Sequence, residues 1–200
     1  MRNLLFTLIL LSAVSCKAQS PVFDVTMDMG IENPNGAYYK DLHNVLNPFE
    51  GTYVYTNGNT SFKIVLQKKE MSTVPNNRYY YDYLIGEYQY IENGIEKVNT
   101  LDRLNINFTD QRNHYIGGNL IITRGDVGCF DCELNEKALR GGLIDGASEH
   151  TADLIIRRII VNNRPAIKIW IGWRTGTSIE GQPAPKRPSF MGTYYTLIKQ

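Results

Sequence analysis

Two cysteines, Cys129 and Cys132, are the residues whose spacing most directly suggests chemistry. In an oxidising compartment, two cysteines three positions apart can close a small disulfide loop. A redox-active pair would instead need a lowered thiol pKa, and the acidic neighbours Asp131 and Glu133 raise that pKa. We therefore interpret Cys129 and Cys132 as a structural disulfide, with a pair of unpaired thiols as the alternative.

The histidines show no pattern of a catalytic or metal site. His43, His114 and His150 lie far apart, and a metal held by the cysteine pair would need His114 or His150 as a further ligand. Residues 146–150 (GASEH) invite comparison with a serine-hydrolase elbow, but they lack its second glycine and its strand–turn–helix context. The sequence predicts no catalytic residue, no bound metal and no cofactor.

Tyrosines are concentrated in residues 79–90, where they alternate along probable strands. Such phenols can fill a core, or they can present rings with hydroxyl tips to a ligand, and the sequence leaves both alternatives open. The residues that we expect to face a ligand, if the interior is open, are Tyr53, Tyr81, Tyr83, Tyr88 and Trp173.

The elements that must position these side chains are short strands. An Asn-Gly pair at 57–58 separates two alternating runs, 52–55 and 62–67, as is typical of a β-hairpin. A second hairpin is expected from 154–161 and 166–173, in which Ile167, Ile169, Ile171 and Trp173 share one face. Further expectations are strands at 104–108, 120–123 and 192–198, a loop over 125–151, and a bulge at 157–158.

This pattern predicts an all-β fold: an antiparallel barrel of about eight to ten strands with one short N-terminal helix. The tripeptide GTY occurs at 51–53 and again at 192–194, near the two ends of the β region. If these first and last strands are neighbours, the barrel has no exposed edge.

A structural cap is expected where the barrel begins. A short helix over 39–46, with Asp41 at its start, should end at Pro48. Phe49 would then lie beneath this helix, and Gly51 would let the chain turn into the first strand.

The first 19 residues are typical of an export signal, with Arg2 before the apolar run 4–11. Residues 13–16 (AVSC) resemble a lipobox, which would make Cys16 the site of lipid attachment; cleavage after Ala18 is the alternative. We expect a flexible arm over 20–40 and a single barrel domain over 41–200. The protein would be exported, as an outer-membrane lipoprotein or as a periplasmic or secreted protein.

The charge balance excludes one class of partner. The chain has 21 basic and 20 acidic side chains, with a formal net charge of +1. Nucleic-acid binding would need a basic face or stripe, so we expect none. Contact with a membrane is expected only through the N-terminal lipid anchor.

The segment 47–53 (NPFEGTY) resembles the Gly-x-Trp start of lipocalin-type barrels, with Tyr53 at the place of the tryptophan. The chain as a whole more closely resembles an uncharacterised family of exported Bacteroidota proteins. Shared features are the signal peptide, the 47–53 phrase, the basic pair 68–69, the segment 86–88 and the ending 196–200. The resemblance covers 40–200; it implies a calycin-like barrel and supplies no substrate.

Two functional hypotheses follow. The first is a non-enzymatic envelope protein whose barrel binds a small apolar or glycan-like ligand. The second is a module with a solid core that contacts another envelope protein, through 125–151 or the proline-rich segment 183–188. An enzyme is the third hypothesis, and the sequence offers no catalytic set for it.

Overall fold

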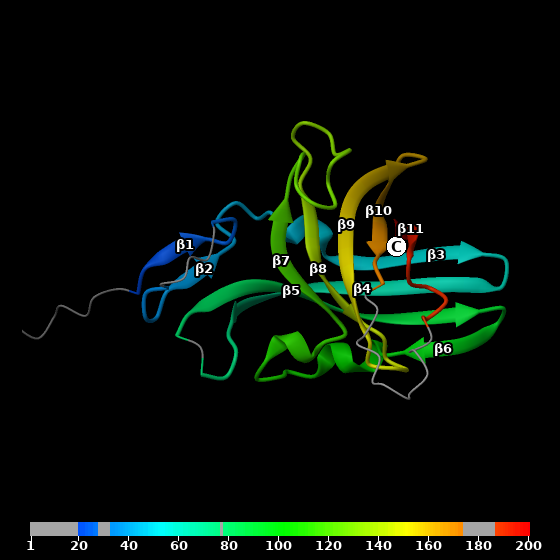
Figure 1. Ribbon diagram of the computed structural model, residues 1–200, viewed down its shortest axis with the longest axis horizontal. Helices are drawn as coiled ribbons and strands as arrows, with labels where there is room; N and C mark the ends of the chain where they lie inside the picture. The colour runs from blue at the N-terminus through cyan, green and yellow to red at the C-terminus, as the bar shows by residue number, and fades with distance from the viewer. Residues whose placement is uncertain (1–19, 28–32, 77, 174–186) are drawn as a thin grey trace, which may run out of the picture.

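The computed structural model describes residues 20–27, 33–76, 78–173 and 187–200, and in it eight antiparallel strands close into a barrel (Figure 1). Each barrel strand is hydrogen-bonded to the next, and the last pairs with the first. This confirms the predicted all-β class and an architecture consistent with a calycin-like barrel. The barrel strands are β3 (Gly51–Asn57), β4 (Thr60–Ser72), β5 (Tyr80–Glu92), β7 (Ile116–Ile122), β8 (Ala138–Ile144), β9 (Thr151–Val161), β10 (Arg164–Ile171) and β11 (Thr193–Lys199).

The barrel closes between β3 and β11, the two strands associated with the repeated tripeptide. Val54 lies opposite Ile198, and Tyr53 lies opposite Lys199. The N–H of Gln200 donates to a β3 carbonyl at 2.9 Å and so extends this seam by one bond. The first and last barrel strands are therefore neighbours, as expected.

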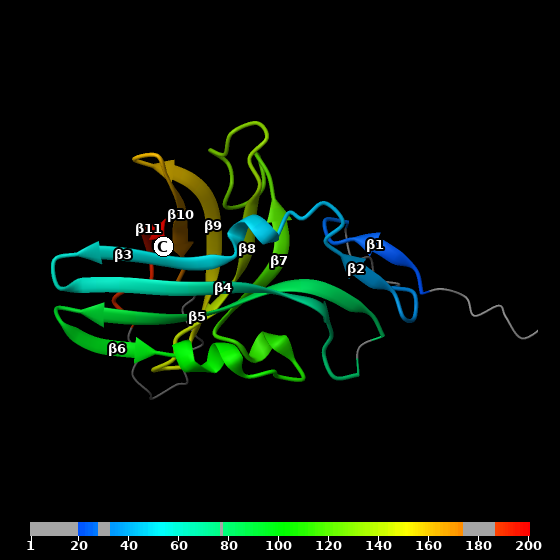
Figure 2. The same cartoon turned by 180° about the vertical axis from the view of Figure 1, so that it is seen from behind.

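The barrel has the shape of two crossed sheets. Strands β3 to β6 run across the direction of β7 to β11, as the opposite views in Figures 1 and 2 both show. The additional strand β6 (Ile95–Asn99) forms a hairpin with β5. Where β5 meets β7, a Cβ on Gly86 would lie 2.6 Å from the Leu66 side chain, so only glycine fits this corner without a shift.

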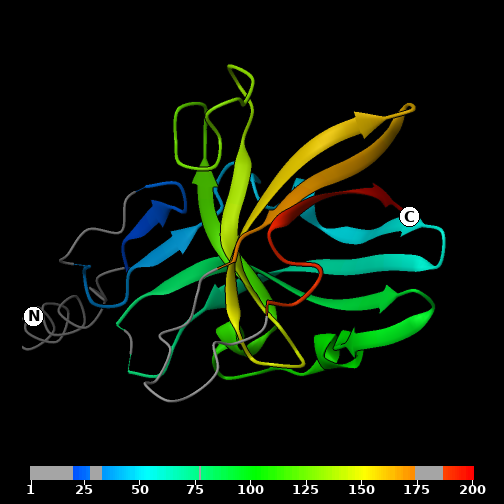
Figure 3. The same ribbon diagram turned by 45° about the vertical axis from the view of Figure 1, so that its right-hand side comes forward.

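Two short strands extend the sheet beyond the barrel. β1 (Val22–Asp24) pairs in parallel with β2 (Tyr38–Lys40), and β2 pairs in parallel with the start of β5 (Figure 3). The described part of the segment 20–40, expected as a flexible arm, thus contains paired strands. Tyr39 and Tyr81 are buried together at this junction.

The short helix expected over 39–46 is absent from that segment. The carboxylate of Asp41 accepts the backbone N–H groups of Val45 (2.7 Å) and Leu46 (2.9 Å). It therefore closes a turn in which Asn44 has a positive φ of 51° that no right-handed helix accepts. The helix that precedes the barrel is a single 3-10 turn, η1 (Asn47–Phe49).

Two other local predictions were wrong. The segment 104–108 is not a strand: its first two residues end the 3-10 turn η2 (Leu101–Asn105), and the rest leads to a second turn, η3 (Gln111–Asn113). The predicted loop 125–151 contains the barrel strand β8. Its glycines suggested a loop, but Gly141 serves close packing, because a Cβ there would lie 2.4 Å from the Gly117 carbonyl oxygen.

The bulge predicted at 157–158 does not exist, since β9 and β10 pair without a register shift across it. The side chains of Arg157 and Arg158 point to opposite faces of the sheet, as in a regular strand, and each contacts a different group. Arg157 binds carboxylates on the outer wall, and Arg158 lies over the Phe49 ring at 5.4 Å. Register shifts occur between Lys69 and Ser72 and between Gly118 and Leu120.

Side chains fill the space inside the barrel. The Phe62 ring, fully buried, has four aromatic neighbours with ring centroids 5.2–5.8 Å away, all in edge-on arrangements. Phe49 of η1 is also fully buried and packs in the same cluster. The neighbours of Phe62 are Tyr88, Tyr90, Phe190 and Tyr195.

Two buried ionic groups accompany this apolar core. Lys68 Nζ lies 3.2 Å from Asp41 Oδ2 and 3.8 Å from Asp82 Oδ2, which links the segment before η1 to β4 and β5. On β5, Glu87 Oε1 lies 2.8 Å from Nδ1 of His114, and both side chains are completely buried. Among the described residues no helix is long and apolar enough to cross a membrane.

Candidate functional site

The five residues predicted to face a ligand do not share one cavity. Tyr53 and Tyr88 belong to the barrel core, 2% and 0% exposed, where they pack instead of lining an open space. Tyr81 and Tyr83 belong to a separate cluster beside β1 and β2. Trp173 is half-buried, with its ring centroid 5.5 Å from that of His150.

The two core phenols use their hydroxyls to hold neighbouring backbone. Tyr53 donates to the carbonyl of Phe49 at 3.0 Å, and Tyr88 donates to the carbonyl of Ile144 at 3.1 Å. Tyr88 also accepts the N–H of Gly146 at 3.0 Å. Burial raises the pKa of Tyr53 to about 12 and that of Tyr88 further, so both remain neutral donors.

A different group of residues forms a groove on the outer wall of the barrel. The strand register places Arg140 of β8 opposite Ile155 of β9, Ile155 opposite Trp170 of β10, and Trp170 opposite Tyr194 of β11. Because directly opposed residues in a sheet point to the same face, these four side chains form one row. Ile167 and Ile169 alternate to the inner face, where they are fully buried.

The loop between β7 and β8 covers this row. Its Cys129 and Cys132 are joined by a disulfide and are buried, in one cluster with Ile155 and Trp170. Gly128 has a positive φ of 94°, and its Cα lies so near Ile155 that an added Cβ would be 1.9 Å from Cδ1. The disulfide therefore shapes a compact loop that lies directly on the wall.

Arg157 fastens this loop to β9. Its Nε donates to Glu136 Oε1 at 2.6 Å and its Nη2 to Oε2 at 2.8 Å, while Nη1 donates to Asp131 Oδ1 at 2.9 Å. The bidentate geometry suits a guanidinium and a carboxylate. The hydrogen bond from Arg157 holds the pKa of both carboxyl groups below the ordinary value, and the carboxylates raise the pKa of Arg157.

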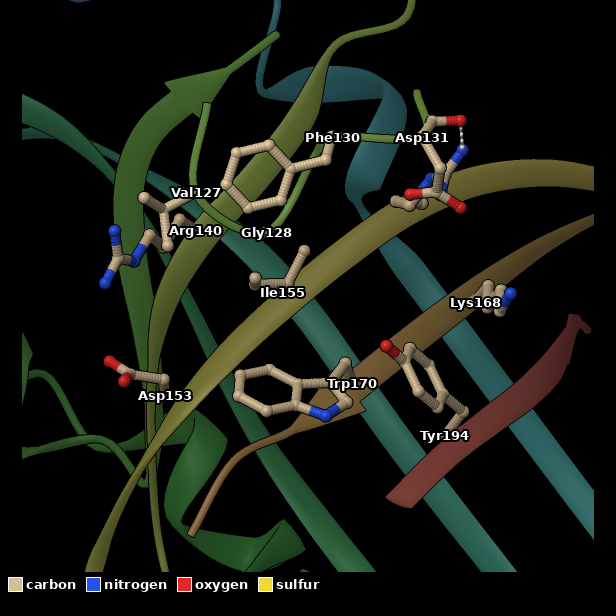
Figure 4. Close-up of a pocket in the computed structure, with 11 residues that line it drawn as sticks. Val127, Gly128, Phe130, Asp131, Arg140, Asp153, Ile155, Lys168, Trp170 and Tyr194 are labelled. Atoms are coloured by element: carbon tan, nitrogen blue, oxygen red, sulfur yellow. Dashed lines mark hydrogen bonds and ion pairs between the residues drawn. The ribbon is translucent and has the colours of Figure 1, made fainter. Parts of the chain in front are cut away.

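The groove has a volume of ≈ 280 Å³. Figure 4 shows Phe130 and Val127 of the loop on one side, with Ile155 and Trp170 of the wall across from them. Tyr194 stands at one end and is 63% exposed. Rings on opposite sides of a small cleft can hold the flat face of a ligand, as apolar ligand sites commonly do.

The indole lies along the wall because its neighbour is a glycine. A Cβ on Gly172 would lie 2.8 Å from the Trp170 ring and 3.4 Å from the Asp153 side chain. The N–H of Gly172 also donates to the Asp153 carbonyl at 2.7 Å, which keeps β9 and the end of β10 together. A side chain at 172 would displace the indole or the backbone beside it.

The groove was missed from the sequence, although one signal was present. The alternation over 166–173 directed attention to the isoleucine face, and Trp173 was grouped with it. The same alternation places Lys168 and Trp170 on the other face, which is the wall of the groove. Arg140 and Tyr194 could not be found in this way, because they join the row through the register of distant strands.

The histidines form no catalytic or metal site in the described residues. His43 is exposed, His114 is buried against Glu87, and His150 Nδ1 lies 2.9 Å from Ser148 Oγ. The Ser148 hydroxyl itself donates to the Asp145 carboxylate, which also accepts the Ser148 N–H at 3.1 Å. In a hydrolase triad the acid orients the histidine, so this cluster has the form of a turn. No group of three metal-ligating side chains occurs in the described ranges.

Fold and site together define a class: a closed eight-stranded antiparallel barrel with a filled interior and a covered groove on its outer wall. The chain matches over residues 1–200 the model of a family described as a family of unknown function (DUF6705), and it belongs to that family. Comparison with curated proteins and with solved structures returned no match.

Proposed function

We propose that the protein is an exported, non-enzymatic binding protein of the cell envelope that holds a small apolar or glycan-like ligand in the outer-wall groove. The observation that carries the proposal is the covered space between the disulfide loop and Trp170. Its volume of ≈ 280 Å³ is near the lower end for small-molecule sites, about 300–1,000 Å³. The ligand would be about the size of one or two rings.

The groove fits this role better than the interior does. The barrel centre is occupied by buried aromatic and aliphatic side chains such as Phe62 and Tyr88, so a ligand there would have to displace core packing. The outer groove offers apolar surface that remains half-open to solvent, with polar groups at its rim. Those are the usual properties of a site that binds and releases a small molecule.

Native mass spectrometry of the mildly purified protein tests the proposal, with Trp170→Ala as the variant. We expect the wild-type chain to carry a small molecule that Trp170→Ala loses. Trp173→Ala is the matched control, since Trp173 stands outside the groove and should leave the bound mass unchanged. A wild-type protein that carries nothing, and whose tryptophan fluorescence no small molecule changes, would overturn the proposal.

A second candidate is the interaction module. It is favoured by the apolar side chains that the loop exposes: Phe130 is 69% exposed and Leu134 is 75% exposed. Large exposed apolar side chains on a constrained loop are typical of protein contacts. Cross-linking in cells with the wild type and with Phe130→Ser/Leu134→Ser distinguishes the two functions, because only an interaction module loses a defined protein partner.

Export and lipid attachment are part of the proposal. They rest on residues 1–19, including Cys16, all of which lie outside the described residues. The resemblance to exported Bacteroidota proteins with a lipocalin-like barrel supports them. Labelling with a fatty-acid analogue should mark the wild type and leave Cys16→Ala unlabelled. Equal labelling would exclude the anchor and leave cleavage after Ala18 as the route.

A further inference from the structure

The groove has more hydrogen-bond donors to offer than acceptors. Arg140 and Lys168 both line it, and in the described ranges neither makes a hydrogen bond or a close ion pair. The hydrogen bond from Arg157 is the largest of the causes that lower the pKa of Asp131, and Lys168, which acts on that carboxylate only at longer range, is the smallest. Lys168 Nζ lies 5.1 Å from the centroid of the Tyr194 ring, so the aromatic face is its neighbour. A guanidinium brings five N–H donors and an ammonium brings three, and none of them accepts.

The acidic groups nearby are already engaged. Both oxygens of Glu136 accept hydrogen bonds from Arg157, and Asp131 accepts another from the same side chain. Asp153 also has a partner. Since Arg157 is used by the loop, the two cations that remain for a ligand are Arg140 and Lys168.

These two cations lie at opposite ends of the groove, with Ile155 and Trp170 between them (Figure 4). Arg140 and Lys168 are two strands apart, and Lys168 is displaced by two residues from the row that contains Arg140. Strand spacing and rise then place their Cα atoms about 12 Å apart. Figure 4 shows the Arg140 guanidinium turned away from Ile155 and Trp170, so it reaches a ligand by rotation of its side chain, and the span between the two ends has room for one six-membered ring and its substituents.

We propose, building on the groove's role as the ligand site, that it takes a ring-bearing carboxylate. The ring lies between the loop apolar side chains and Trp170, the carboxylate accepts two parallel hydrogen bonds from Arg140, and a hydroxyl at the far edge accepts one from Lys168. The planar fork of arginine matches a carboxylate, whereas an ammonium serves a single acceptor. Two sources share this chemistry: an acidic sugar and an aromatic acid.

Two matched pairs of probes test the inference: galacturonate against galactose, and 4-hydroxybenzoate against 4-hydroxybenzyl alcohol. Binding is followed by Trp170 fluorescence in a Trp173→Phe background. We expect the acid of at least one pair to bind ten-fold or more tightly than its neutral partner. The pair that responds identifies the source, sugar or aromatic.

Arg140→Gln should abolish the preference for the acid and leave the affinity for the neutral partner unchanged. Arg140→Lys keeps the positive charge but lacks the planar guanidinium, so it should retain part of the preference for the acid. This variant replaces Arg140→Gln in the test if Arg140→Gln does not fold. Lys97→Gln, an exposed cation on β6, removes the same charge elsewhere and should change nothing.

Equal affinity for acid and neutral partners, or a preference that survives Arg140→Gln, overturns the inference and leaves the groove as a ligand site. Failure of both acids to bind a protein that still carries a Trp170-dependent small molecule in native mass spectrometry also overturns the inference alone. Failure of both experiments overturns the proposed function together with it.

Discussion

Gly128 of the disulfide loop lies against Ile155 of β9 so closely that a β-carbon at position 128 would fall 1.9 Å from Ile155 Cδ1. This contact sets the height of the loop above the wall. Any side chain at 128 must lift the loop or displace Ile155, and both changes alter the groove.

Gly128→Ala should therefore lower the free energy of unfolding by about 1–3 kcal/mol, the usual cost of overpacking, and weaken ligand binding. Gly125→Ala is the matched control: its φ is also positive, at 98°, but nothing lies within 4 Å of the added carbon. Urea unfolding of both variants separates contact from backbone strain. An equal decrease in unfolding free energy for Gly128→Ala and Gly125→Ala would show that the contact with Ile155 does not contribute to the cost.

Phe49→Ala should cost about 3–5 kcal/mol, because Phe49 is fully buried where η1 meets the barrel. Its aromatic counterpart on the loop, Phe130→Ala, should change stability by less than about 0.5 kcal/mol, since that ring is 69% exposed. Chemical denaturation of the two variants measures both values. A loss well under 1 kcal/mol for Phe49→Ala would mean that η1 does not cap the core.

The buried Glu87–His114 pair should be energetically coupled. Oε2 of Glu87 and Nε2 of His114 are buried without a partner in the described residues, so each group depends on the single contact of 2.8 Å. Glu87→Ala or His114→Ala should each cost about 3–5 kcal/mol, because the remaining partner stays buried and unpaired. The double variant should cost less than the sum by about 1 kcal/mol or more. Additive losses would show that the two side chains act independently.

Stability should decline at alkaline pH, in part through Tyr53. Burial raises the pKa of this phenol from 10.0 to about 12 in the folded protein. Below pH 10 the phenol is neutral in both states and its contribution is complete; between about pH 10 and 12 only the unfolded state ionises, so the contribution is lost. The stability difference between wild type and Tyr53→Phe should shrink across that range. Absorbance at 295 nm follows the ionisation of all 13 tyrosines, so the difference between wild type and Tyr53→Phe isolates Tyr53. A difference that titrates near pH 10 in the folded protein would contradict the prediction.

Loss of the disulfide should loosen the loop more than the barrel. For so short a loop the chain-entropy relation gives about 2 kcal/mol of stability. The free energy of unfolding of Cys129→Ser/Cys132→Ser should be lower by about this amount, and the variant should bind ligand weakly. Reductant should lower the stability of the wild type and leave that of the variant unchanged. Thermal melts with and without reductant measure both effects. Unchanged binding would separate the disulfide from the groove.

Local sequence signals predicted much of the barrel. The Asn-Gly turn at 57–58 located β3 and β4, and strict alternation located β10. Prediction failed where glycine had a tertiary role: Gly141 looked like part of a loop because its purpose, close contact with Gly117, depends on a distant strand. The helix expected over 39–46 failed because a side-chain carboxylate satisfied the backbone N–H groups in a turn.

The candidate site was less predictable than the fold, for a physical reason. The cysteine spacing indicated a constrained loop, but nothing local shows which strand face that loop covers. The row from Arg140 to Tyr194 exists only because four strands pair in one particular register. Such a register follows from the packing of the whole barrel, and a one-residue slip would send each of these side chains to the other face.

The position of the groove on the outside of a filled barrel has a kinetic consequence. A molecule that enters a closed barrel must wait for a mouth or lid to open, so its arrival is gated by protein motion. A molecule that binds on the outer wall meets no such gate, and arrival should depend on diffusion alone. Differences in affinity among ligands and variants should then appear as differences in residence time.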